Sequence, residues 1–131
     1  MYLLDTNICI YAINRRPPEV MDRLIAAGRK AVGISSITAA ELAFGGVKSQ
    51  RAATRVNVEA FLATMPVFEW GGDAVWRYAE TRLALEKVGR RVGERDLFIA
   101  AHALALDAIV VTNDEREFAR VPGLRWENWA A

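Results

Sequence analysis

Cysteine and histidine are almost absent from this 131-residue chain, which has one of each, Cys9 and His102. A single cysteine excludes an internal disulfide and any zinc site built from several cysteines. A single histidine excludes centres with several histidine ligands, including the H-E-x-x-H motif. We expect Cys9 to serve packing and His102 to be a hydrogen-bonded side chain of the core.

An excess of positive charge is also missing, since 17 Lys and Arg residues stand against 16 Asp and Glu residues and leave a net charge of +1. A strongly basic nucleic-acid-binding protein is therefore excluded, and any contact with nucleic acid must rest on a local patch. Only three of the cations are lysines, so arginine dominates. Arginine presents a planar fork of donors that suits phosphate and carboxylate groups.

Long apolar runs are absent as well. The richest stretch, Leu97–Val111, is interrupted by His102 and Asp107 and is shorter than the ~18–20 residues that a membrane span needs. The first residues carry no basic segment and reach an acid at Asp5, so we expect no signal peptide. The composition predicts one domain, residues 1–131, located in the cytoplasm without membrane association.

Short apolar segments, typical of strands in a parallel sheet buried on both faces, alternate with longer amphipathic segments. We expect strands at Tyr2–Leu4, Ala31–Ile34, Val67–Trp70, Ala108–Thr112 and Leu124–Trp126. We expect helices at Ile8–Ile13, Glu19–Ala27, from the cap Ser35-Ser36 to Gly45-Gly46, and at Gln50–Met65, Asp73–Val88, Leu97–Leu106 and Asn113–Ala119. This alternation predicts a three-layer α/β/α fold around a short parallel central sheet.

Four acids lie in apolar surroundings or at the ends of predicted strands: Asp5, Glu41, Asp96 and Asp114. Ligand sites of parallel α/β sheets form outside the carboxyl ends of the strands, which is where Asp5 and Asp114 stand. Burial of carboxylates without a countercharge is unfavourable, and by pattern only Arg95 is a cation in the right place. Oxygen ligands without cysteine or histidine suit Mg²⁺ or Mn²⁺ rather than zinc, and such ions activate water and stabilise charge on a phosphodiester.

Each of these acids also has an interpretation as a helix cap. Asp5, Asp96 and Asp114 could each cap the helix that follows it. Glu41 could close the capping box Thr38-Ala39-Ala40-Glu41. Because four coincidental caps around one edge are improbable, the metal-site interpretation is favoured.

Four motifs occur in order along nearly the whole chain, from about Met1 to Trp129. They are Asp5-Thr6-Asn7, Ile37-Thr38-Ala39-Ala40-Glu41-Leu42, Asp96-x-x-Ile99-Ala100-Ala101-His102-Ala103, and Val111-Thr112-Asn113-Asp114 followed by Glu117-Phe118 and Val121-Pro122-Gly123-Leu124. Together they resemble the PIN-domain family, and more narrowly its VapC-type ribonuclease toxins of bacterial type II toxin–antitoxin modules.

The resemblance implies a PIN-like fold and an Mg²⁺- or Mn²⁺-dependent endoribonuclease that cleaves structured RNA such as tRNA. It also implies a homodimer that a VapB-type antitoxin holds inactive. We expect an antitoxin helix to dock on apolar side chains of the first helix, together with one beyond the Glu41 helix. These side chains are Ile8, Ile10, Tyr11, Ile13 and Val47.

The resemblance also implies roles for particular residues. The catalytic and metal-binding acids would be Asp5, Glu41, Asp96 and Asp114, with Glu117 as an additional candidate acid. Thr6 or Asn7 would orient the first acid, and the Thr112 hydroxyl would support the metal site. Candidate RNA contacts are Arg90, Arg91 and Arg95.

The chain departs from the family pattern at two places. Many relatives carry Gly-Pro-Asn before the third acid, where this chain has Gly93-Glu94-Arg95 and so gains an acid and a cation at the edge of the site. Close relatives often have Asn at the position of Asp114, so this fourth ligand would be less essential than the other three.

Three other classes compete with the ribonuclease hypothesis. A receiver-type signalling domain would need paired acids after the first strand and a lysine after the last sheet strand, and this chain has neither. A haloacid-dehalogenase-like phosphatase would need Asp-x-Asp where this chain has Asp5-Thr6-Asn7. A degenerate PIN domain that only binds a partner is disfavoured by the four intact acids.

Overall fold

The computed structural model describes residues 1–131 as five short strands, seven α-helices and one 3₁₀ turn. The strands are β1 (Tyr2–Leu4), β2 (Val32–Ser35), β3 (Val67–Phe68), β4 (Ile109–Val111) and β5 (Trp126–Glu127). The helices are α1 (Thr6–Asn14), α2 (Pro18–Ala27), α3 (Ser36–Lys48), α4 (Ala52–Thr64), α5 (Asp73–Lys87), α6 (Glu94–Leu106) and α7 (Glu115–Phe118), and the 3₁₀ turn is η1 (Arg29–Ala31). Every predicted strand and helix is present; β1 has the predicted ends, and each of the other elements is shifted at one or both ends.

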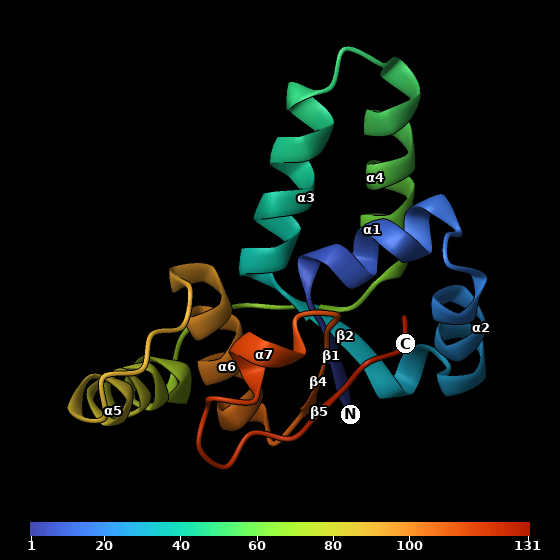
Figure 1. Ribbon diagram of the computed structural model, residues 1–131. Helices are drawn as coiled ribbons and strands as arrows, with labels where there is room; N and C mark the ends of the chain where they lie inside the picture. Colours follow the sequence, from blue (N-terminus) through green and yellow to red (C-terminus); the bar gives the residue numbers. More distant parts are fainter.

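All five strands are parallel and lie in the order β3-β2-β1-β4-β5. Helices α1 and α2 lie on one side of the sheet, and α5, α6 and α7 lie on the other (Figure 1). The predicted three-layer α/β/α fold with a parallel central sheet is therefore confirmed. The observed order also contradicts the receiver-like alternative, because receiver domains have the order 2-1-3-4-5.

Successive side chains of the central strands point to opposite faces of the sheet, and each face has its own core. Leu4 and Val111 pack in one cluster with residues of α1, α2, α3 and α4. Leu3 and Val110 pack in the other cluster with residues of α6 and α7. Burial on both faces explains why β1 and β4 are continuous apolar runs rather than alternating ones.

From β1 the chain adds β2 and β3 on one side of the sheet, and it then adds β4 and β5 on the other side, so the strand order reverses between the neighbours β1 and β4. Parallel α/β sheets form their ligand sites at such a reversal, outside the carboxyl ends of the strands. Asp5 follows β1 directly, and its backbone amide donates to the carbonyl of Val111 at the end of β4, at 3.0 Å. Asp114 follows β4 three residues after Val111. The topology therefore brings both acids to one edge.

Helix α3 does not stop at Gly45-Gly46, as predicted, but continues to Lys48. Glycine inside a helix costs about 1 kcal/mol relative to alanine. Gly46 is buried where α3 packs on α4, and a Cβ at this position would lie 3.5 Å from the Cα of Arg55, so tertiary packing outweighs the low helix propensity. The two helices form an arm that rises from the rest of the molecule (Figure 1).

The starts of α3 and α6 show whether Glu41 and Asp96 serve as helix caps. Ser35 caps α3 as predicted, since its Oγ accepts a hydrogen bond from the Ile37 amide at 3.2 Å, which leaves Glu41 free of capping. Helix α6 begins at Glu94 rather than at Leu97, and its N-cap is Gly93. Asp96 therefore lies inside the first turn, and its interpretation as a cap is wrong.

Cys9 and His102 both lie in the core, as predicted. Burial raises the pKa of the Cys9 thiol and lowers the pKa of His102. The Nδ1 of His102 lies 2.8 Å from the Ser35 hydroxyl oxygen, so the buried imidazole has a hydrogen-bond partner. None of the helices combines the length and apolar character that crossing a membrane requires.

Candidate functional site

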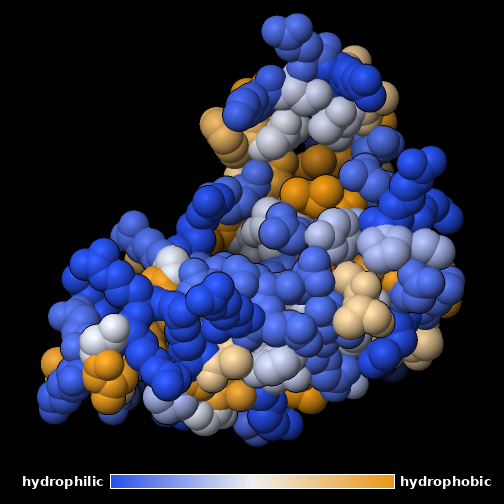
Figure 2. Space-filling view, in the orientation of Figure 1, coloured by the Kyte–Doolittle hydropathy of each residue, from blue (hydrophilic) through white to orange (hydrophobic).

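A cavity of about 480 Å³, called here the acid cavity, opens at the carboxyl edge of the sheet. Residues of α1, α3 and α6 line it, together with the residues that follow β1 and β4. Seven residues singled out from the sequence lie on its wall: Asp5, Thr6, Asn7, Glu41, Arg95, Asp96 and Asp114. The surface at the foot of the α3–α4 arm is mainly hydrophilic (Figure 2).

Asp5 is buried at the point where β1 becomes α1. Its Oδ1 accepts a hydrogen bond from the Ile8 amide at 2.9 Å, so Asp5 caps α1 and also faces the acid cavity. Burial raises the pKa of Asp5, and hydrogen bonding by the Thr112 side chain and the Ile8 amide opposes that rise. Thr6 and Asn7 line the cavity, but the bond that orients Asp5 comes from Ile8 instead.

Asp96 has a strongly raised pKa. Burial and, after it, the charges of Asp114, Asp5 and Glu117 together raise its pKa to about 6, although Arg95 lowers it. A pKa of about 6, against 3.8 for an ordinary aspartate, means that the carboxylate form is poorly compensated within the chain. Groups with such shifts concentrate at functional sites.

Glu41 lies in the middle of α3, and it is paired with a cation. Arg95 on α6 donates through Nη1 to Glu41 Oε2 at 2.5 Å. The Arg95 side chain is 69% exposed, whereas Glu41 is 30% exposed, so the pair lies at the solvent edge of the cavity. Both side chains line the cavity, as their sequence positions led us to expect.

Asp114 lies at the start of α7 and acts as its N-cap. Its Oδ1 accepts from the Glu117 amide at 3.3 Å, and its own amide donates to the Thr112 hydroxyl oxygen at 2.8 Å. The fully buried Thr112 thus connects Asp114 and Asp5, the two acids that follow neighbouring strands. Asp114 therefore fulfils the predicted cap and also belongs to the acid cluster.

Glu117 joins the cluster from α7. One carboxylate oxygen from each of Asp96, Asp114 and Glu117 lies within 4.8 Å of the others. Glu117 Oε1 accepts from the Gly93 amide at 3.2 Å, while its buried Oε2 makes no hydrogen bond. The nearest cation is Arg120, 3.7 Å from Oε2.

Two predicted arginines lie outside the acid cavity, and one relevant arginine was missed. Arg90 and Arg91 line a neighbouring cavity instead. Arg120 donates through Nη1 to the carbonyl of Arg91 at 2.5 Å and lies close to Glu117. The i,i+3 spacing of Glu117 and Arg120 is the sequence signal that could have found it.

The donor set of this cluster fits a hard divalent cation. All its side-chain donors are oxygens, which suit Mg²⁺ or Mn²⁺, and neither cysteine nor histidine lines the cavity. The Oε2 of Glu117 is a buried acceptor that receives no hydrogen bond, next to Asp96 and Asp114. The raised pKa values of Asp5 and Asp96 indicate that the chain alone does not neutralise the cluster.

Comparison with known proteins identifies the family, since residues 2–124 match the family model of the PIN domain. The chain belongs to the PIN-domain family. Within that family, the chain is similar to the VapC ribonucleases. It is 40% identical over 131 residues to Ribonuclease VapC2 of Rickettsia felis, and the match covers 98% of each chain. It is also 40% identical over 130 residues to the tRNA(fMet)-specific endonuclease VapC of Shigella flexneri, again over 98% of each chain.

Solved structures agree with this assignment. The crystal structure of VapBC2 from Rickettsia felis, bound to a DNA fragment from their promoter, matches with a TM-score of 0.90 and 39% identity over 98% of each chain. The predicted resemblance to VapC-type PIN domains is therefore confirmed. The receiver-like and haloacid-dehalogenase-like alternatives are excluded, and a PIN domain that only binds a partner is the alternative that experiment must test.

Proposed function

We propose that this PIN domain is the ribonuclease toxin of a toxin–antitoxin pair and that the acid cavity cleaves RNA with the help of Mg²⁺ or Mn²⁺. The observation that carries the proposal is the position of Asp96, partly buried among Asp5, Asp114 and Glu117, where burial and the neighbouring charges raise its pKa to about 6. A protein that only binds a partner has no need of such a poorly compensated cluster.

The ion would be held by oxygens of Asp5, Asp96, Asp114 and Glu117, with Glu41 at the solvent edge. When bound, it lowers the pKa of water and offsets negative charge on the phosphodiester. The chain itself holds the acids in position. Capping of α1 and the Thr112 hydroxyl orient Asp5, and the Gly93 amide orients Glu117.

Arg95 would contact the substrate at the same edge. It lines the acid cavity, and its mostly exposed guanidinium can exchange the Glu41 carboxylate for a phosphate oxygen. Neutralisation of phosphate charge by a nearby arginine favours binding of RNA to a cavity that is otherwise acidic. Arg95 thus offsets the repulsion between the RNA phosphates and the acids, while the acids stay in place for the metal ion.

The names of relatives support a proposal for the substrate class. Two similar proteins, from Shigella flexneri and Salmonella typhimurium, are named tRNA(fMet)-specific endonucleases, at 40% and 36% identity. We propose that this chain also cleaves structured RNA, with initiator tRNA as the first candidate, and that it acts in the cytoplasm, where tRNA is found.

The partner would be a VapB-type antitoxin, because similar structures are VapBC complexes. Exposed apolar side chains are available for it at Ile10 on α1 and at Phe44 and Val47 on α3. Ile8, expected in the same surface, is fully buried because it points from α1 into the core, so that part of the expectation is wrong. We also propose a homodimer, as the family resemblance implies.

Induced expression in a bacterial host, followed by sequencing of new RNA 5′ ends, tests the proposal. A ribonuclease toxin arrests growth and produces new ends at defined sites in one or a few RNAs. The same chain with Asp5→Asn must produce neither effect. Growth arrest without new ends, equal for both proteins, would instead favour the domain that only binds a partner.

The antitoxin part is tested separately by co-expression of the protein that the neighbouring reading frame encodes. It should restore growth and co-purify with this chain. If it does neither while RNA is still cleaved, the chain is a ribonuclease but not half of such a pair.

A further inference from the structure

A second cavity of about 530 Å³ lies beside the acid cavity, between α5 and the segment that joins α5 to α6. We call it the arginine cavity, because Arg82, Arg90 and Arg91 line it. Glu94 lines both cavities, so they adjoin at the start of α6. The volume lies within the roughly 300–1,000 Å³ typical of ligand sites. The chemistry proposed for the acid cavity makes no use of it.

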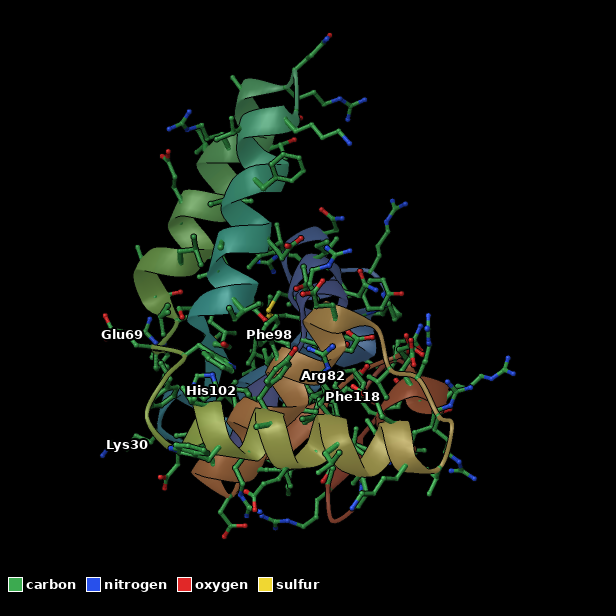
Figure 3. The ribbon with its side chains drawn as sticks, turned by 90° about the vertical axis from the view of Figure 1, so that its left-hand side faces the viewer. Lys30, Glu69, Arg82, Phe98, His102 and Phe118 are labelled. Carbon is green, nitrogen blue, oxygen red and sulfur yellow. The ribbon has the colours of Figure 1, made fainter.

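Arg82 is the fixed member of the three arginines. Its Nε donates to Glu86 Oε2 at 2.9 Å, and its Nη1 donates to the Tyr78 hydroxyl oxygen at 3.2 Å. Tyr78 in turn stacks on Phe98 of α6, with 4.6 Å between ring centroids. The guanidinium therefore points from α5 toward α6, on the side of Phe98 (Figure 3).

Arg90 and Arg91 have free guanidinium groups on a segment that is itself held in place. Neither side chain forms an ion pair within the chain. The Arg90 amide donates to the Leu85 carbonyl at 2.9 Å, and Arg120 donates to the Arg91 carbonyl. The two cations therefore stand on an ordered backbone with donors that no internal acceptor uses.

Glu117 connects this segment to the acid cluster. It accepts from the Gly93 amide, two residues after Arg91, and it lies with Asp96 and Asp114 in the acid cluster. The Glu117 side chain thus helps to fix the position of the free arginines relative to the acids. A site positioned before the ligand arrives loses less entropy on binding.

We infer that the arginine cavity binds the phosphate backbone of the RNA next to the bond that the acid cavity cleaves. This inference rests on the proposed ribonuclease function. Planar guanidinium donors match phosphate oxygens. The three arginines outnumber Glu86 and Glu94 on the same wall, which leaves the cavity positive beside an acidic one. An RNA strand that crosses Glu94 passes from one cavity into the other.

Contacts with phosphate position a nucleic acid without reading its sequence. Loss of the free arginines should therefore weaken binding of every RNA to a similar extent. The test uses the double variant R90A/R91A. The matched control is R29A/K30A, which removes two adjacent exposed cations from η1, ahead of β2 and outside both cavities.

Binding is measured in the full chain carrying Asp5→Asn, with a transcribed initiator tRNA and with an unstructured oligoribonucleotide. For R90A/R91A we expect roughly tenfold weaker binding of both RNAs. The slope of log affinity against log salt concentration should become shallower by about one to two, because fewer counterions are released on binding. In the cleaving protein the same variant should raise KM with kcat nearly unchanged. The control R29A/K30A should behave as the unsubstituted chain.

Unchanged affinity and salt dependence in R90A/R91A would overturn the inference, as would an equal loss in R29A/K30A. If arginine-dependent binding is found but the unsubstituted chain cleaves no RNA, the arginine cavity is supported and the proposed ribonuclease function fails. If the chain cleaves RNA and R90A/R91A binds and cleaves equally well, the ribonuclease function is supported and the arginine cavity fails.

Discussion

Arg95 pairs with Glu41 across the edge of the acid cavity, although 54 residues separate them in the sequence. Arg95 is the one cation on a wall that carries five carboxylates: Asp5, Glu41, Glu94, Asp96 and Asp114. It also lowers the pKa of Asp96, in opposition to burial and to the neighbouring acids. One arginine thus partly compensates two acids while its guanidinium stays open to solvent and to substrate.

Removal of this cation by Arg95→Ala should strengthen metal binding and weaken RNA cleavage. The acids on the cavity wall lose the one cation that lies among them, so the Mn²⁺ affinity measured by calorimetry should rise. RNA loses a phosphate contact, so KM should rise. The free energy of unfolding should fall by at most about 1 kcal/mol, because the pair is exposed.

Arg125→Ala provides the control, since Arg125 also forms an exposed ion pair, with Asp107, but lies outside the acid cavity. It should leave Mn²⁺ affinity and cleavage unchanged. Weaker Mn²⁺ binding by Arg95→Ala would contradict the assignment of Arg95 as the countercharge of the cluster.

Two substitutions of Asp5 separate its structural role from its chemical role. Asparagine can still accept the hydrogen bond from the Ile8 amide, so Asp5→Asn should keep the cap and lose cleavage. Alanine cannot accept it, so Asp5→Ala should lose cleavage and also about 1 kcal/mol of stability relative to Asp5→Asn. Urea denaturation in EDTA and RNA cleavage measure the two effects. Retained cleavage in Asp5→Asn would mean that Asp5 is only a cap.

Asp96 makes the stability of the metal-free protein depend on pH. Its pKa is about 6 when folded and near 3.8 when unfolded, so the folded state takes up the proton first. The free energy of unfolding in EDTA should therefore rise as the pH falls through about 6 and level off below about 4. Asp96→Asn should remove this contribution and be more stable than the unsubstituted chain at pH ~7, by about 1 kcal/mol.

Asp22→Asn, on the exposed face of α2, is the matched control and should follow the unsubstituted chain at each pH. A metal-free Asp96→Asn protein that is less stable at neutral pH would show that Asp96 supports the fold rather than a ligand.

Glu117 should contribute to metal binding, whereas Glu115, on the same short helix, should not. Metal that binds only the folded cluster raises Tm with its concentration, by an amount equivalent to about 2.7 kcal/mol at 100 times the Kd. Glu117→Gln should reduce the rise in Tm produced by Mg²⁺, and Glu115→Gln should leave it intact. Equal responses of the two variants would remove Glu117 from the ligand set.

Local chemistry made much of the fold predictable. Continuous apolar runs such as Tyr2–Leu4 are typical of strands buried on both faces, and Ser35-Ser36 caps α3 as predicted. The errors occurred where tertiary packing overrides local propensity. Gly45-Gly46 remains helical because α3 packs on α4, and α6 gains a turn that begins at Glu94.

The acids could be chosen from the sequence because charge in apolar surroundings is conspicuous in a single chain. Their partners could not, because contacts between distant segments leave no local signal. The pairing of Glu41 with Arg95 and the bond from the Gly93 amide to Glu117 depend on the three-dimensional arrangement of α3, α6 and α7. The arginine cavity depends in the same way on how α5 packs against α6.

The most direct test of the acid cavity as a metal-dependent ribonuclease site is cleavage of a transcribed initiator tRNA by the purified chain. We expect discrete products with Mg²⁺ or Mn²⁺, none in EDTA, recovery when excess Mg²⁺ is added back, and a loss of orders of magnitude in Asp5→Asn with its fold intact by circular dichroism. Cleavage that persists undiminished in EDTA, or that Asp5→Asn performs at the full rate, would contradict the account.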